Sequence, residues 1–306
     1  MKVKPTVAAP IVVCAVLALT LLFSVVPASA LGLDDNPYLT TVILQLVIFM
    51  LPSLFFCTFR GTEYREKLRL KFPPTSSLLF VICSLVVMVC GSCVIEYFMS
   101  LVSPVSMAES TAAGRAAYAM NEGFFDGFYL VLAFALLPAL TEEFLFRGII
   151  VTEYGSLGIF TSVLMSSIMF AMCHLSLVRF PVYMFCGIIL AIVAYGTRSV
   201  IAPMIVHTVY NVFVLFFEGY VLHLAEKQNI SALLFVIIAA GCTILFASFM
   251  CFEAAGLYRS YAIENVSSDH VPVKKTKAAS AVAFAVFSPS FIVLAVAYII
   301  IVLVKR

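Results

Sequence analysis

The sequence predicts an all-α polytopic membrane protein, a bundle of about eight to nine transmembrane helices around a central polar cavity. Its 306 residues are 63% hydrophobic and 11% charged, with a mean hydropathy of +1.13. Soluble domains are roughly half apolar and a quarter charged. Apolar runs of spanning length recur along the whole chain, and acidic, histidine and amide side chains interrupt some of them. These observations predict a single transmembrane domain, 1–306, with a polar centre.

Charge and cysteine content exclude two other classes of protein. The formal net charge of +2 is too small to indicate a nucleic-acid partner. The nine cysteines are an odd number and nearly all lie within apolar runs, where a thiol behaves as a small hydrophobic side chain. We therefore expect neither a disulfide framework nor binding to nucleic acid.

Nine segments reach the length of about 20 mostly apolar residues that a spanning helix needs. The first has an alternative interpretation, because its basic start and Ala28-Ser29-Ala30 resemble a cleaved secretory signal within 1–31. Its apolar core is longer than that of a typical signal and another apolar run follows at once, so we expect it to be retained. In order, the segments are 7–30, 38–59, 77–102, 126–152, 157–177, 180–197, 199–221, 231–252 and 279–304.

The basic residues predict which side of the membrane each loop faces. Five lysine or arginine residues lie in 60–71 and four in 253–278, and such residues are enriched in cytoplasmic loops. Nine spans place both loops in the cytoplasm with the N-terminus, and leave 103–123 and Lys305-Arg306 outside. We expect a multi-pass membrane protein whose polar centre is reached from the cytoplasmic side.

Two adjacent carboxylates and an arginine lie inside the apolar segment 126–152, as Glu142, Glu143 and Arg147. Burying ionised carboxylates in hydrocarbon is costly unless they are paired or face water. Glu143 and Arg147 are four residues apart and share a helix face, whereas Glu142 is turned away by about 100°. We expect Arg147 to neutralise Glu143, and Glu142 to act on water or substrate as a general base.

Two further polar groups interrupt later apolar segments. His174 follows Phe170 by four residues, and Asn211 follows His207 by four. His174 could share a proton with Glu142, while His207 and Asn211 could donate to a developing oxyanion. At 1.5 Å per residue from the predicted cytoplasmic helix ends, Glu142 is ~17 Å deep, His174 ~25 Å and His207 ~12 Å. All three depths fall within a hydrocarbon core of about 30 Å.

Proline precedes two of these polar residues by four positions: Pro138 before Glu142, and Pro203 before His207. Because proline removes a helical hydrogen bond, it kinks a helix. We expect both helices to be kinked there, with freed carbonyl groups lining the polar cavity.

The three polar segments resemble, in order and residue type, the motifs of the CAAX protease and bacteriocin-processing family (CPBP, or Abi) of intramembrane endopeptidases. The family pattern is E-E-x-x-x-R, then F-x-x-x-H, then H-x-x-x-N. Its positions are filled here by Glu142, Glu143, Arg147, Phe170, His174, His207 and Asn211. The resemblance covers about residues 125–215, the motif-bearing core, and extends to neither end of the chain.

The resemblance implies a glutamate-type endopeptidase similar to the Ras-converting enzyme, which removes the last three residues of prenylated CAAX proteins. In this family, Glu142 and His174 would activate water, and His207 and Asn211 would stabilise the oxyanion. Glu143, Arg147 and Phe170 would support them. The implied partners are the lipid bilayer and a membrane-associated peptide or protein, prenylated or bacteriocin-like. No metal or other cofactor is expected.

Other interpretations of the same residues stay open. The motifs could serve helix packing alone, as a buried ion-pair cluster, a core histidine and a polar contact between helices. Two glutamates and two histidines could form a zinc site in a metal-dependent version of the protease. They could also relay protons in a transporter, although the sequence lacks the duplicated halves that are common in transporters. A catalytically silent membrane scaffold is the remaining alternative.

Overall fold

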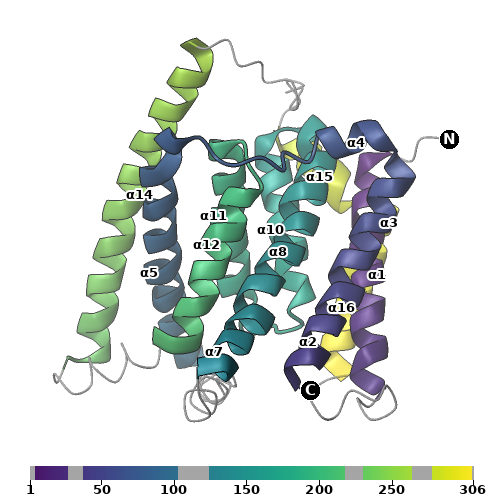
Figure 1. Ribbon diagram of the computed structural model, residues 1–306, viewed down its shortest axis with the longest axis horizontal. Helices are drawn as coiled ribbons and strands as arrows, with labels where there is room; N and C mark the ends of the chain where they lie inside the picture. The colour runs from purple at the N-terminus through teal and green to yellow at the C-terminus, as the bar shows by residue number, and fades with distance from the viewer. Residues whose placement is uncertain (1–3, 27–36, 103–123, 218–229, 264–277, 305–306) are drawn as a thin grey trace.

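The computed structural model describes residues 4–26, 37–102, 124–217, 230–263 and 278–304, and every regular element in these ranges is helical (Figure 1). The predicted class, an all-α membrane protein, is confirmed. The elements before the motifs are α1 (Pro5–Val25), α2 (Pro37–Gln45), η2 (Leu46–Met50), α3 (Leu51–Arg60), α4 (Thr62–Glu66), η3 (Thr75–Ser77) and α5 (Leu78–Val102).

The motif-bearing part is a long interrupted helix followed by three shorter ones. Its elements are α7 (Phe124–Val131), η5 (Leu132–Leu136), α8 (Leu137–Glu143), η6 (Phe144–Ile150), α9 (Val151–Tyr154), η7 (Gly155–Leu157), α10 (Ile159–Cys173), α11 (Phe180–Thr197), α12 (Ile201–Val212) and η8 (Phe213–Phe217). The chain continues with α14 (Ala232–Ile263), α15 (Ala278–Val286) and α16 (Pro289–Val304). The segments η2, η5, η6 and η8 are π-helical, and η3 and η7 are 3₁₀ turns.

Fewer helices reach spanning length than the eight to nine predicted. In the described ranges, six helices are long and apolar enough to cross a membrane, and the bent pair α15–α16 makes a seventh if it is one span. The predicted spans 157–177 and 199–221 correspond to the shorter apolar helices α10 and α12–η8. At 1.5 Å per residue, a helix of this length falls short of the roughly 30 Å hydrocarbon core. Both of these shorter helices carry motif residues.

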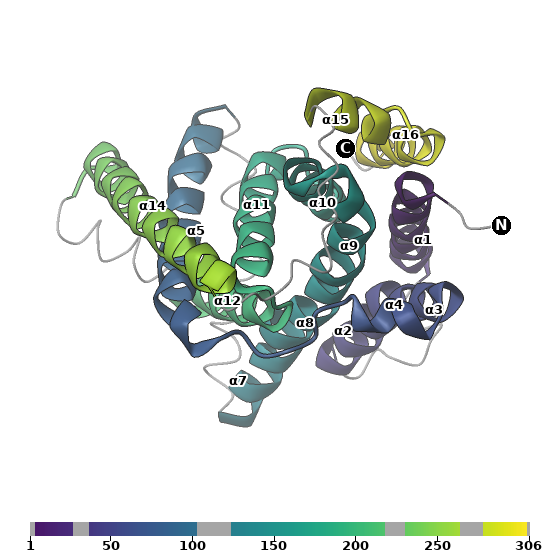
Figure 2. The same cartoon turned by 90° about the horizontal axis from the view of Figure 1, so that it is seen from above.

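Helix α11 lies near the centre of the bundle when it is seen from above (Figure 2). It packs against α10, α5 and α12, while α14 packs along α5 at one edge. On the opposite side, the first helix, α1, packs along the last, α16, and α2–η2 lies against α8. The motif helices α8, α10 and α12 therefore surround the interior, and the terminal helices cover them from outside.

A π-helical turn precedes Pro138, and the predicted kink there stays a prediction. The π-helical turn η5 ends two residues before this proline, and such a widened turn accommodates the missing N–H. Pro203 is instead the third residue of α12, within its first turn. Backbone N–H groups there have no acceptor inside the helix. The predicted kink at Pro203 is wrong, because proline in this position removes no helical hydrogen bond.

Basic residues mark one end of the bundle. The start of α1, helix α4 and the end of α14 all lie at the upper end in Figure 1. Arg69 Cζ lies 5.4 Å from the Tyr195 ring centroid, and Arg198 Cζ lies 4.1 Å from that of Tyr261. These contacts tie the loop after α4 to the ends of α11 and α14. The loop 60–71 and the beginning of 253–278 thus share one side with the N-terminus, and the assignment of that side to the cytoplasm stays a prediction.

Helix α1 is packed into the bundle. Ala9, Val13 and Val16 are fully buried, and the helix contacts α16, α3 and α9. Its retention stays a prediction, because Ala28-Ser29-Ala30 lies outside the described residues. The predicted outer segments 103–123 and Lys305-Arg306, and 264–277 of the second basic loop, lie outside them too.

Candidate active site

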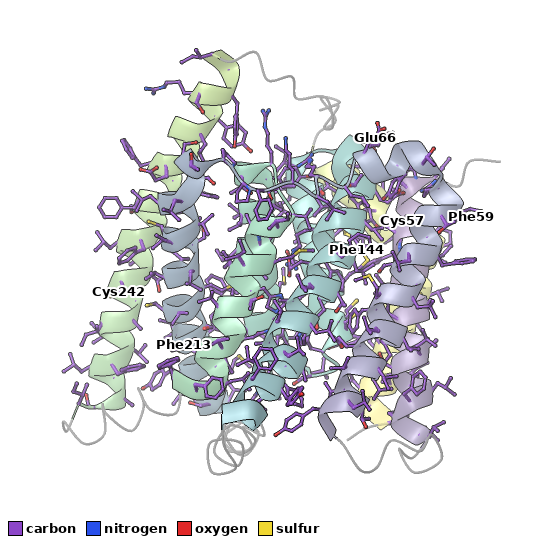
Figure 3. The ribbon with its side chains drawn as sticks, in the orientation of Figure 1. Cys57, Phe59, Glu66, Phe144, Phe213 and Cys242 are labelled. Atoms are coloured by element: carbon purple, nitrogen blue, oxygen red, sulfur yellow. The ribbon has the colours of Figure 1, made fainter. Side chains whose placement is uncertain are left out.

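Glu142 and Glu143 are the last two residues of α8, and Arg147 lies in the π-helical turn η6 that follows. Phe144, which directly follows Glu143, is labelled in Figure 3 and lies well inside the two ends of the bundle. Glu143 is 0% exposed, Arg147 1% and Glu142 8%. Charged side chains are seldom buried so completely unless they are paired. The contacts of these three side chains therefore define the site.

Arg147 pairs with Glu143, as expected. Its Nη1 donates to Glu143 Oε1 at 2.6 Å, and its Nη2 donates to the Gly187 carbonyl of α11 at 2.9 Å. The guanidinium carbon lies 4.7 Å from the centroid of the Phe170 ring, within range of a cation–π contact. Arg147 thus connects the acidic pair to α10 and α11 while it compensates the charge of Glu143.

Gly187 permits the close approach of α10 and α11 at this point. A Cβ on Gly187 would lie 3.0 Å from both Cα and Cβ of Ser167. Two serines on α10 also bind backbone carbonyls in the helical segment after Glu143. Ser162 donates to the Val151 carbonyl of α9 at 2.8 Å, and Ser166 donates to the Phe146 carbonyl of η6 at 3.1 Å. These contacts fix α10, and with it Phe170 and the following His174, relative to the acidic pair.

His207 also binds Glu143. Its Nδ1 lies 2.9 Å from Glu143 Oε1, the oxygen that accepts from Arg147. A carboxylate that accepts from arginine can only accept from the imidazole too, so Nδ1 carries the proton. Glu143 therefore orients the ring and leaves Nε2 as the nitrogen available to a substrate. The sequence did not predict this contact.

Asn211 lies one turn further along α12 and has a different partner. Its Nδ2 donates to the carbonyl of Ala135, in the π-helical turn η5, at 3.3 Å. An amide nitrogen carries two N–H groups, so one remains after this bond is made. His207 and Asn211 thus share a helix, as predicted, and each is oriented by a separate element.

His174 directly follows α10, and its Nδ1 lies 2.9 Å from the Phe170 carbonyl. Because a carbonyl oxygen only accepts, Nδ1 is the N–H, and the neutral ring carries its lone pair on Nε2. Tyr183 of α11 stacks on the imidazole, with centroids 3.8 Å apart and planes at 23°. Sequence reasoning missed Tyr183, since one aromatic residue in an apolar helix has no distinguishing pattern.

The Phe170 ring lies between the two histidines. Its centroid is 4.8 Å from that of His174 and 5.8 Å from that of His207. Because Phe170 also faces the Arg147 guanidinium, this one aromatic side chain contacts residues from all three motifs. The structure thereby brings together Glu143, Arg147, Phe170, His174 and His207.

Glu142 has a partner that lies far from the motifs in sequence. Gln45, the last residue of α2, donates from Nε2 to Glu142 Oε1 at 3.1 Å. Gln45 is the one amide side chain in the apolar segment 38–59, and a buried amide needs a partner. Its isolation in an apolar segment could have marked Gln45 as a candidate functional residue, although the sequence does not reveal its partner.

The arrangement does not fit a zinc site formed by motif residues. In the part of the chain that the structure describes, no three His, Cys, Asp or Glu side chains group closely enough to hold a metal ion. The Nδ1 atoms of both motif histidines are already engaged, by the Phe170 carbonyl and by Glu143. The motif side chains are thus not arranged as a set of zinc ligands, and the expected absence of a cofactor stays a prediction.

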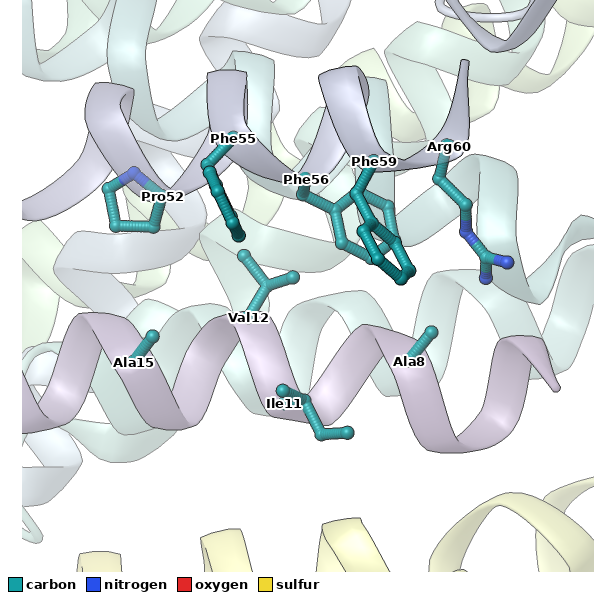
Figure 4. A pocket seen from close by; sticks show the side chains of 9 residues that line it. All are labelled: Ala8, Ile11, Val12, Ala15, Pro52, Phe55, Phe56, Phe59 and Arg60. Carbon is teal, nitrogen blue, oxygen red and sulfur yellow. The ribbon is translucent and has the colours of Figure 1, made fainter. Parts of the chain in front are cut away.

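A separate hollow lies between α1 and α3 (Figure 4). It has a volume of about 300 Å³, and its walls are apolar side chains, with Arg60 as the charged residue among them. Phe55 and Phe59 point from α3 towards α1 in this view. No acidic or histidine side chain lines this hollow, so it is distinct from the polar cluster around Glu142.

Comparison with known families agrees with the motifs. A family model described as type II CAAX prenyl endopeptidase, Rce1-like, matches residues 124–213. Comparison with curated proteins and with solved structures found no match. The matched residues span α7 to the first residue of η8, and they contain every motif position from Glu142 to Asn211. Residues 124–213 therefore form an Rce1-like segment, and this similarity agrees with the family that the three motifs resemble.

Proposed function

We propose that this protein is an intramembrane glutamate-type endopeptidase that hydrolyses a peptide bond in a membrane-associated substrate. One observation carries the proposal: two neighbouring buried carboxylates have different partners. Glu143 accepts from Arg147 and His207, whereas Glu142 accepts from the neutral amide of Gln45. Glu142 thus forms no ion pair with a described residue, and a general base needs a carboxylate oxygen that water can reach.

In the proposed reaction, Glu142 takes a proton from water as the water oxygen attacks the carbonyl carbon of the scissile peptide bond. His174, whose Nε2 is the accepting nitrogen of the neutral ring, assists by accepting a hydrogen bond from the same water. The carbon–oxygen bond forms and the carbonyl oxygen becomes negative. The proton held by Glu142 then passes to the amide nitrogen, the carbon–nitrogen bond breaks, and an acid and an amine leave.

His207 and Asn211 would stabilise the negative oxygen. Because His207 Nδ1–H faces Glu143, its Nε2 can donate only when the ring is an imidazolium. Asn211 contributes the N–H that is not bound to the Ala135 carbonyl. Donors fixed in this way before the reaction stabilise developing charge without reorganisation.

The proposed substrate is a membrane-associated peptide or protein, prenylated or bacteriocin-like, as the family resemblance implies. The apolar helices around the site suit a substrate that approaches from the bilayer. The transport alternative gains nothing from the comparison, since the matching family model is described as an endopeptidase.

The proposal is tested by comparing the proteomes of membranes that contain wild-type protein, Glu142→Gln or Glu96→Gln. Glu96 lies on α5, so its variant controls for the same chemical change outside the site. Membranes with Glu142→Gln should accumulate uncleaved precursors that are processed in the other two. If all three membranes contain the same mature termini, the proposed function is wrong.

A further inference from the structure

Gln45 lies outside the Rce1-like segment and donates a hydrogen bond to the proposed general base. It ends α2, is half-buried, and donates from Nε2 to Glu142 Oε1 at 3.1 Å. Glu142 accepts no other hydrogen bond from a described residue. The family match begins at residue 124, so nothing in the motifs assigns a role to this amide.

The chemistry of the donor suits a base. A cation beside a carboxylate stabilises its charged form and weakens it as a proton acceptor. A neutral amide orients the carboxylate with a weaker electrostatic effect. The two glutamates differ in this respect, because Arg147 and His207 contact Glu143. Gln45 thus fixes one oxygen of Glu142 and leaves Oε2 for water.

The position of Gln45 is itself fixed by the surrounding helices. The π-helical turn η2 begins at the next residue and packs against α8 and η6, and π-helical turns are frequent at functional sites. At the end of α3, Arg60 forms an ion pair with Glu153 of α9. Tyr64 donates to the Ile149 carbonyl at 3.3 Å. These contacts hold the segment from α2 to α4, which carries Gln45, against α8, η6 and α9.

We propose that Gln45 is a positioning residue for Glu142, so that α2 completes an active site that the family motifs describe only in part. The inference rests on the proposed peptidase function. Its consequence is that the N-terminal helices are required for turnover and do more than cover the motif segment.

Replacing Gln45 by methionine tests this role, because methionine has a similar length and no N–H donor. Gln45→Met should lower kcat by about 10-fold to 100-fold with KM nearly unchanged, as expected for loss of a hydrogen bond to a charged group. The matched control is Ser53→Ala on α3, whose hydroxyl donates to the Phe49 carbonyl at 2.6 Å. It should keep the wild-type kcat. Equal kcat in the two variants, or an effect confined to KM, would overturn the proposal.

A second measurement separates this inference from the proposed function. The melting temperatures of Gln45→Met, Glu142→Ala and the double variant form a cycle that needs no substrate. Coupled residues should give a double-variant shift that differs from the sum of the single shifts. Additive shifts in melting temperature would show that Gln45 and Glu142 do not interact, and this result would overturn the proposal whether or not the protein cleaves a peptide. A coupled cycle in a protein without peptidase activity would refute the proposed function and, with it, the role of Gln45 in positioning a catalytic base.

Discussion

His207 Nδ1 and Glu143 Oε1 lie 2.9 Å apart, which joins the first and third motifs across 64 positions of sequence. Arg147 binds the same carboxylate oxygen at 2.6 Å. Glu143 therefore holds together α8, η6 and α12, three of the elements that form the site. Glu142, one residue earlier, has a single neutral donor among the described residues. The two neighbouring glutamates thus have different structural roles, and their variants should differ accordingly.

Glu143→Ala should destabilise the protein more than Glu142→Ala does. Removing Glu143 leaves the buried Arg147 without its carboxylate, which costs about 3–5 kcal/mol for a buried ion pair. Removing Glu142 leaves only the neutral amide of Gln45 without its acceptor. Thermal unfolding of the purified variants in detergent measures the difference. Equal melting temperatures for the two variants would remove the basis for separating their roles.

Asn211→Ala should retain substrate binding and lose most turnover. Loss of one oxyanion donor lowers kcat by roughly 10²–10³-fold. The control is Thr208→Ala on the same helix, whose hydroxyl donates to the Met204 carbonyl at 2.7 Å and which should behave as wild type. Steady-state kinetics separate the two parameters. A raised KM with normal kcat would instead assign Asn211 to substrate binding.

Gly187→Ala should lower both stability and activity. The added Cβ would lie 3.0 Å from Ser167 Cα and force α10 from α11, displacing the carbonyl that binds Arg147. Overpacking of this kind costs about 1–3 kcal/mol. Gly241→Ala on α14 is the control, since its Cβ would meet nothing within 4 Å and alanine favours a helix. If both variants melt and cleave alike, the close approach at Gly187 is not required.

Peptidase activity should not require a metal ion. The proposed donors His207 and Asn211 supply the stabilisation that a Lewis acid would give the oxyanion. Purified protein should keep its activity in a strong chelator and contain less than stoichiometric metal by mass spectrometry. Stoichiometric zinc, with activity lost on chelation and restored by zinc, would contradict the glutamate mechanism and make Glu142, His174 and His207 ligand candidates.

Local pattern was sufficient to predict the helical class and the Glu143–Arg147 pair. Inside a membrane, a single apolar segment of spanning length can form all its backbone hydrogen bonds only as a helix. A spacing of four residues places two side chains on one face of that helix. The predicted number of spans is not confirmed in the same way, because hydropathy does not reveal that α10 ends at Cys173, before the predicted boundary at 177.

The contacts between distant segments could not be read from the sequence. Gln45 binds Glu142 across 97 positions of sequence, and His207 binds Glu143 across 64. Each pair lies on two different helices, so no local spacing predicts the contact. Tyr183 contacts His174 because α11 packs on α10. This packing depends on the absence of a side chain at Gly187, where a Cβ would lie 3.0 Å from Ser167. Tertiary packing decides these pairings, whereas the local pattern decides which residues are available for them.

The central claim, that Glu142 is the base of a peptide hydrolysis, is tested most directly with the purified protein in lipid vesicles and a precursor found in the membrane comparison. Wild-type protein and Glu96→Gln should cleave the precursor at equal rates. Glu142→Gln should fold, melt within a few degrees of wild type, and show no cleavage above background. Cleavage by Glu142→Gln at a rate near that of wild type would contradict the account.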